Sequence, residues 1–162
     1  MTNDIVTSIR SMRGKKVARR TRSCGSSFPS DLERALGDES GATFGEVVAQ
    51  HVSLEGSIFA TPISGREKVW TSLRTASSIT DRLSFTHEST TSDRSYLEWE
   101  LEALAQRFEG ITVLTFDSSG LVDNVAVHHR PLGAVLAFSA EMGRRLADSL
   151  GPSVFYRGPR GS

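Results

Sequence analysis

Residues 96–104 read Tyr-Leu-Glu-Trp-Glu-Leu-Glu-Ala-Leu, with apolar and acidic side chains alternating along most of the stretch. A period of two is typical of a β-strand that has one buried and one exposed face. We therefore expect Leu97, Trp99 and Leu101 to face a core. The three intervening glutamates then face outward, as a solvated row or as part of a dimer contact.

Three further strands are expected around this one. Residues 83–87 alternate before it, and residues 111–116 and 122–129 follow it. The last two are joined by Asp117-Ser118-Ser119-Gly120, a turn sequence whose glycine accommodates a positive φ. Short connections of this kind predict a four-stranded antiparallel meander.

Helices are expected before, between and after these strands. Ser30 opens a short helix at capping-box spacing from a glutamate, and a second short helix covers residues 44–48. A strand then spans residues 51–59, a helix spans residues 66–79, and Pro131 starts a final helix with an apolar stripe. An apolar sheet face must be covered, and the helices are available to cover it. The order predicts an α+β fold.

Composition excludes several classes of protein. The chain has 162 residues, of which 38% are hydrophobic and 23% charged, as in one ordinary globular domain. No apolar run approaches the roughly 18 residues of a transmembrane helix, so we expect no membrane partner. The single cysteine, Cys24, cannot form an internal disulfide and fits a reducing compartment, so a cytoplasmic location is expected. The four histidines lack metal-ligand spacing, so no metal site is expected.

Charge divides the chain into a basic beginning and an acidic remainder. Residues 1–30 carry seven basic residues and one acidic residue, whereas the rest carries twelve basic and eighteen acidic ones. We interpret residues 1–27 as a basic disordered leader, 28–150 as the domain and 151–162 as a tail. A basic arm could bind phosphate backbones, but no stacking aromatics accompany these charges. A solvated tail is the simpler interpretation, and no nucleic-acid partner is expected.

Two passages carry a family resemblance. HVSLEGSIFATPISGREKVWTSL, residues 51–73, gives a strand, a proline, a glycine and a helix; VLTFDSSGLVDNVAVHHRPL, residues 113–132, gives a hairpin and a strand ending in Arg-Pro. Over residues 30–150 the chain resembles the SnoaL-like / ketosteroid-isomerase-like branch of the nuclear-transport-factor-two-like superfamily. The resemblance implies a curved antiparallel sheet wrapped around helices into a cone with an internal pocket, the cystatin-like α+β barrel. It also implies a homodimer through the outer sheet face and chemistry without a cofactor.

The isomerases of this family use a general-base carboxylate at the end of the first strand, a second acid and a tyrosine. Counted back from Gly65 without gaps, the first position falls on Gly56; the other two fall on Thr112 and near Leu32. None of the three carries the family's residue. Glu55 should point to the opposite face, although a register slip of one residue would turn it inward.

Alternation places three polar side chains in the implied pocket, namely His87, Thr112 and His129. Burial lowers the pKa of a histidine, so His129 and His87 are candidate general bases, and Thr112 is a candidate positioning group. Each histidine has an alternative role as a hydrogen-bonded structural residue. The remaining expected ligand contacts are apolar or aromatic: Trp99, Phe116, Leu114, Phe85, Val127 and Trp70.

Three functions remain open. The first is a cofactor-independent isomerase, cyclase, dehydratase or hydrolase that acts on a small apolar metabolite and uses a pocket histidine as base. The second, suggested by the missing isomerase carboxylates, is a non-catalytic ligand-binding or accessory dimeric protein. The third is an interaction module that uses the outer sheet face or the basic arm.

Overall fold

The computed structural model describes residues 42–156. The elements within this range follow in the order α3 (Ala42–Val47), β1 (Val48–Gly56), β2 (Ile63–Ser64), α4 (Arg66–Ile79), β3 (Thr80–Thr90), β4 (Arg94–Ala103), β5 (Gln106–Phe116), β6 (Val122–Arg130) and α5 (Leu132–Leu150). The expected leader, residues 1–27, and the helix opened by Ser30 lie outside the described residues. None of the helices from residue 42 to residue 156 is long and apolar enough to span a membrane.

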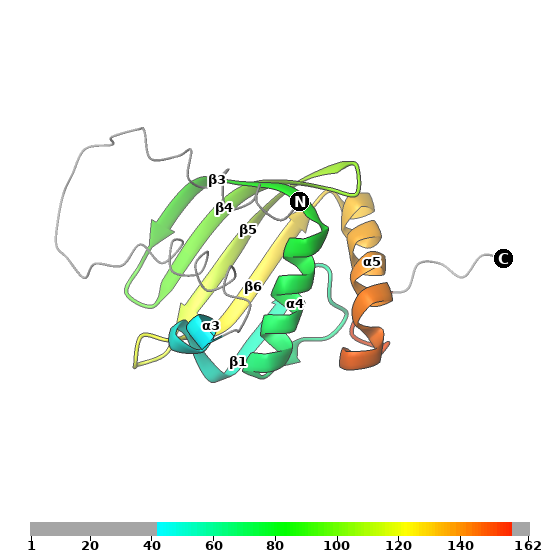
Figure 1. The fold of residues 1–162 in the computed structure, drawn as a ribbon. Coiled ribbons are helices and arrows are strands. Elements are labelled where there is room, and N and C mark those ends of the chain that lie inside the picture. The colour runs from blue at the N-terminus through cyan, green and yellow to red at the C-terminus, as the bar shows by residue number, and fades with distance from the viewer. Residues whose placement is uncertain (1–41, 157–162) are drawn as a thin grey trace.

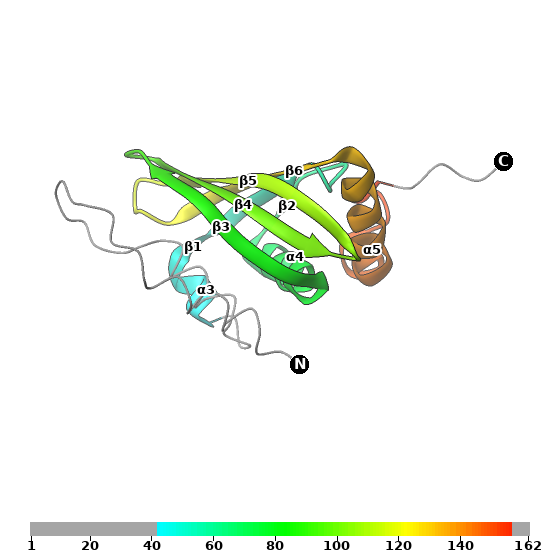
Figure 2. The same ribbon diagram turned by 90° about the horizontal axis from the view of Figure 1, so that it is seen from above.

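The six strands form one curved, open sheet in the order β2-β1-β6-β5-β4-β3 (Figure 1). Strands β3 to β6 are paired antiparallel, which confirms the expected meander. One pair departs from a purely antiparallel sheet, because β1 runs parallel to β6. Helices α4 and α5 both lie against one side of the sheet, which we call the inner face (Figure 2). The expected α+β class with a curved sheet against helices is confirmed.

The core lies between the inner face and the helices. Leu97, Trp99 and Leu101 of β4 are buried as their alternation predicts. Phe108 of β5 meets Phe138 of α5 edge-on, with ring centroids 5.6 Å apart. Burying large apolar side chains of this kind contributes about 2 kcal/mol each, and this burial holds α5 against the sheet.

The turn at Asp117 forms as its sequence predicts. The carboxylate of Asp117 accepts hydrogen bonds from the backbone N–H groups of Ser119, at 2.8 Å, and Leu121, at 3.0 Å. Gly120 has a φ of +81° and its N–H donates to the Asp117 carbonyl at 3.0 Å. This turn sets β5 and β6 side by side.

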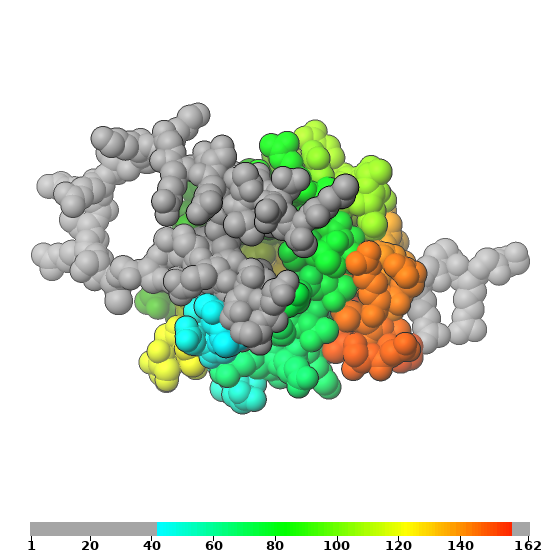
Figure 3. All heavy atoms as spheres, viewed as in Figure 1, coloured from blue at the N-terminus to red at the C-terminus, as the bar shows by residue number. Residues whose placement is uncertain are grey.

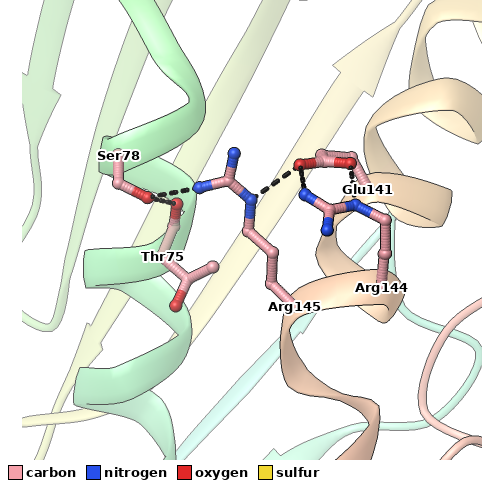
Figure 4. Close-up of polar contacts among 5 residues, drawn as sticks. All are labelled: Thr75, Ser78, Glu141, Arg144 and Arg145. Carbon is pink, nitrogen blue, oxygen red and sulfur yellow. Dashed lines mark hydrogen bonds and ion pairs between the residues drawn. The ribbon is translucent and has the colours of Figure 1, made fainter.

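Helices α4 and α5 are also joined by polar contacts where they lie side by side (Figure 3). The carboxylate of Glu141 accepts hydrogen bonds from both Arg144 and Arg145, at 2.7 to 2.8 Å. Arg145 reaches across to Ser78, whose hydroxyl donates to the Thr75 carbonyl of α4 (Figure 4). These arginines lower the pKa of Glu141 to about 2.

A buried serine attaches the stretch after α5 to the domain. The hydroxyl of Ser139 donates to the carbonyl of Ile58 at 2.6 Å and accepts the backbone N–H of Tyr156 at 3.1 Å. Nearby, Phe155 is buried and its ring lies 5.7 Å from that of Phe59. The stretch that was expected to be a tail from residue 151 therefore packs on the domain as far as Phe155.

Candidate functional site

His129 lies at the end of β6 on the inner face and is anchored by Ser57. The backbone N–H of His129 donates to Ser57 Oγ at 2.8 Å, and the ring nitrogen Nδ1 lies 3.1 Å from the same oxygen. The N–H of Ser57 in turn donates to the Val127 carbonyl at 3.0 Å. Because Nδ1 is engaged by Ser57, Nε2 is the nitrogen through which the ring can act on a bound molecule.

Aromatic side chains surround the His129 ring. Trp99 lies edge-on at 5.0 Å between ring centroids, Phe138 at 6.0 Å and Phe108 at 6.4 Å. Burial lowers the pKa of His129 to about 4; the charge of the neighbouring His128 lowers it further, while a hydrogen bond with the Val127 carbonyl opposes the change. The ring is therefore neutral at pH 7, as a general base must be before it accepts a proton.

Trp99 and Thr112 form a second polar pair on the same face. The indole N–H of Trp99 donates to Thr112 Oγ1 at 3.0 Å. Thr112 lies opposite Val127 of β6, and His129 lies opposite Gly110, so the two polar side chains are diagonal neighbours about 7 Å apart along the sheet. With its oxygen accepting from Trp99, the Thr112 hydroxyl can still donate its own proton to a ligand.

The expectation that His87 faces the pocket is wrong, because a β-bulge interrupts β3. Phe85 pairs with Trp99, but His87 pairs with Glu98, so Thr86 is the additional residue. Residues directly opposite in an antiparallel pair share a face, and Glu98 is exposed on the outer face. His87 is likewise exposed on that face, on the opposite side of the sheet from His129.

The expected apolar contacts divide into two groups. Leu114 is fully buried and belongs to the core. Four others are partly buried and pack at the margin of the core, where their exposed parts can meet a ligand: Phe85, Phe116, Val127 and Trp70. The Trp70 ring also contacts Phe44 of α3 at 5.2 Å between centroids. Trp99 is almost wholly buried and contributes its indole edge to the surroundings of His129.

The positions of the isomerase residues carry no acid among the described residues. A Cβ atom on Gly56 would overlap the Val127 carbonyl oxygen, so this backbone admits no side chain there. Glu55 is exposed on the outer face, and the buried Leu54 pairs with Val125, so the register slip that would turn Glu55 inward does not occur. The Leu32 position lies outside the described residues.

Alternation along the strands does not predict the positions of two polar residues, Ser57 and Glu88. Alternation places Ser57 on the same outer face as Glu55, two residues before it. The strand ends at Gly56, however, and the chain then turns Ser57 toward His129. A serine next to a glycine at the end of a strand is a common sequence feature, so it does not by itself indicate a functional residue. Strict alternation from Phe85 would place Glu88 on the outer face, but the bulge in β3 reverses this. In residues 42–156 no three metal-ligating side chains gather into a possible metal centre.

The curved open sheet packed against α4 and α5 is a cystatin-like α+β fold. Neither a family model nor a curated protein matches the sequence. Solved structures do match. One is an uncharacterised cystatin-like protein from Silicibacter pomeroyi, with a TM-score of 0.68 and 18% sequence identity. The alignment covers 76% of this chain and 87% of that protein's chain.

Two further neighbours carry names that indicate an activity. A steroid delta-isomerase from Pseudomonas aeruginosa has a TM-score of 0.66 at 19% identity, over 75% of this chain and 90% of its own. A candidate SnoaL-like polyketide cyclase from Jannaschia sp. has a TM-score of 0.57 at 13% identity, over 75% of this chain and 99% of its own. These neighbours match the branch that the sequence resembles, and at such identities they establish the fold.

Proposed function

We propose that the protein binds a small apolar metabolite between the inner sheet face and its helices, and that His129 acts on it as a general base. The observation that carries the proposal is the neutral His129 ring, held by Ser57 among aromatic rings at the end of the inner face. The fold neighbours named as an isomerase and a candidate cyclase support the same reaction class.

The pKa of His129 limits the chemistry available to it. A base with a pKa of about 4 removes protons efficiently only from an acidified position. A carbon next to a carbonyl group meets this requirement when a hydrogen-bond donor stabilises the developing oxyanion. In the proposed step, Nε2 of His129 takes the proton, Thr112 donates to the carbonyl oxygen, and Ser57 supports the imidazolium that forms. Isomerisation and aldol-type cyclisation both begin in this way.

The test compares two adjacent histidines. A library of apolar carbonyl compounds is screened by thermal shift, and the compounds that bind are then tested for conversion to product. We expect His129→Gln to retain binding and lose at least about a hundredfold in turnover, the usual size of a general-base effect. His128→Gln, on the exposed side of the same strand, should retain both binding and turnover. Unchanged turnover in His129→Gln would exclude His129 as the base.

A specific observation favours a non-catalytic binding protein as the second candidate. The first isomerase position is Gly56, which cannot carry a side chain, and the adjacent Glu55 points away. Thermal stabilisation by a compound that is recovered unchanged after prolonged incubation would support this alternative over catalysis.

We also propose a homodimer through the outer sheet face, in the reducing cytoplasm. Half-buried apolar side chains occupy the middle of that face, among them Ile111, Val113 and Ala126, with the exposed Glu98 and His128 beside them. An apolar centre with a polar border is typical of a subunit contact. Sedimentation velocity should give a dimer that Val113→Glu converts to a monomer. A monomer at all concentrations of the unchanged chain would refute this contact.

A further inference from the structure

The bulge that turns His87 outward places Glu88 on the inner face. Beyond the bulge, Glu88 pairs with the buried Leu97, and the following pairs continue in the same register. The hydroxyl of Thr90, two residues on, lies 2.9 Å from that of Ser95, which is itself buried on the inner face. Two independent contacts therefore show that even-numbered side chains of β3 face inward after Thr86.

Glu88 also lies in line with the proposed site. The register places Glu88 opposite Leu97, and Leu97 opposite Thr112. Since strands are about 4.8 Å apart, the backbones of Glu88 and Thr112 are separated by about 10 Å. This is the length of a small apolar molecule that spans the inner face, with one end at Thr112 and His129 and the other at Glu88.

Glu88 has no partner among residues 42–156. Among the described residues it has no hydrogen bond or ion pair, and it is an exposed residue at the edge strand β3. Partial desolvation of the carboxyl group by neighbouring atoms of the sheet raises its pKa, and no charged neighbour contributes. Two of the three cations of helix α4 are engaged elsewhere: Arg66 donates to the Val48 carbonyl at 2.6 Å, and Arg74 lies over the Trp70 ring at 5.8 Å. The third, Lys68, is exposed and makes no hydrogen bond or ion pair with Glu88. His129, the other ionisable group on this face, is neutral at pH 7.

We propose that Glu88 is the specificity-determining anchor of the inner-face site, and that it selects apolar ligands whose far end is an amine or another hydrogen-bond donor over ligands that end in a carboxylate. This inference rests on the proposed function, since it describes the other end of the same ligand. A carboxylate accepts a hydrogen bond from an ammonium or hydroxyl group but repels a second carboxylate.

An inward-pointing charge on an edge strand has a second possible role, which is to prevent pairing with another sheet. The two roles predict different results. Loss of the protective charge would increase association of the protein without changing ligand preference. Loss of an anchor would change ligand preference at an unchanged oligomeric state.

The test uses three compounds with one apolar body and different ends: naphthylethylamine, naphthylethanol and naphthylacetate. Binding to the full chain is measured at neutral pH by fluorescence titration. We expect the amine to bind most tightly and the acetate most weakly. Glu88→Gln should weaken binding of the amine by about tenfold, because it removes a charged hydrogen bond at an exposed position. The same substitution should strengthen binding of the acetate. The matched control Glu98→Gln, on the outer face of β4, should leave the order unchanged.

Each outcome separates the two proposals. If none of the three compounds binds the unchanged chain, the proposed ligand site is overturned and the anchor with it. If they bind and Glu88→Gln leaves their order unchanged, the anchor is overturned while the proposed function stands. If Glu88→Gln shifts the order as Glu98→Gln does, the effect comes from net charge and the anchor is likewise overturned.

Discussion

The indole ring of Trp99 occupies the space above Gly110 that a side chain would need. A Cβ atom on Gly110 would overlap the Trp99 atoms Cζ2 and Cη2 and also the His128 carbonyl oxygen. The glycine thus allows the ring to lie over β5 and to reach Thr112, to which its N–H donates. One small residue in the middle of a strand sets the position of the largest side chain near His129.

Gly110→Ala should therefore displace Trp99 and destabilise the fold by about 1 to 3 kcal/mol, the usual cost of overpacking. Denaturant unfolding measures the loss. Fluorescence in a Trp70→Phe background reports the new environment of Trp99. Gly133→Ala is the matched control: nothing lies within 4 Å of a Cβ there, and the residue is in α5, so this change should stabilise slightly. Equal effects of the two substitutions would contradict the close packing at Gly110.

The pKa of His129 makes stability depend on pH in a defined range. The folded-state pKa is about 4 and the ordinary value is 6.5, so the unfolded chain takes up this proton first as the pH falls. Above pH 6.5 the group contributes nothing, and between pH 6.5 and pH 4 stability falls by roughly 3 kcal/mol in total. His129→Gln should remove this decline, whereas His128→Gln should leave most of it. Parallel stability curves for wild type and His129→Gln would refute the lowered pKa.

Ser57 should fix the tautomer of His129. Ser57 Oγ lies against Nδ1, and the Val127 carbonyl, which accepts the Ser57 N–H, also hydrogen-bonds the ring. A proton on Nδ1 would donate to Ser57 Oγ, which leaves Nε2 as the basic nitrogen. Long-range proton–nitrogen NMR spectra should show this tautomer in the wild type and a mixture in Ser57→Ala. A wild-type ring protonated on Nε2 would make His129 a donor instead of a base.

Ser139 should be the most costly serine to remove within residues 42–156. It is buried and makes two hydrogen bonds, one to Ile58 and one from Tyr156, so Ser139→Ala leaves two backbone groups unpaired. We expect a loss of about 1 to 3 kcal/mol in denaturant unfolding. Ser149→Ala, at a partly exposed position of the same helix, should change stability by about 0.5 kcal/mol or less. Similar values for the two variants would show that Ser139 does not attach the C-terminal stretch.

Strands and helices could be predicted where burial of one face requires apolar side chains at regular intervals along the sequence. Leu97, Trp99 and Leu101 face the core because a shift of one residue would expose all three, and the apolar stripe of α5 is buried against the sheet for the same reason. The turn at Asp117 is specified by its own residues, an aspartate that accepts backbone hydrogen bonds and a glycine with a positive φ. These features are local, so the sequence alone reveals them.

The candidate site was only partly predictable because it depends on departures from periodicity. His129 follows the alternation of β6 and was identified, whereas His87 follows a bulge that no residue type marks. Ser57 was missed because its partner is 72 residues away and its own strand ends just before it. The internal pocket remains a prediction, since its outline depends on side-chain packing that no spacing rule describes.

The parallel pairing of β1 with β6 has a consequence for synthesis on the ribosome. β1 is the first strand of the sheet to be synthesised, whereas β6, with which it pairs, is the last. Ser57 therefore cannot contact His129 until the ribosome has made β6. At about 5 to 20 residues per second, translation of the intervening stretch takes several seconds. During that time the hairpins β3–β4 and β4–β5 can already close, and β1 joins the sheet only after β6 has been added to them. The proposed pairing of Ser57 with His129 therefore forms only after β6 has been synthesised.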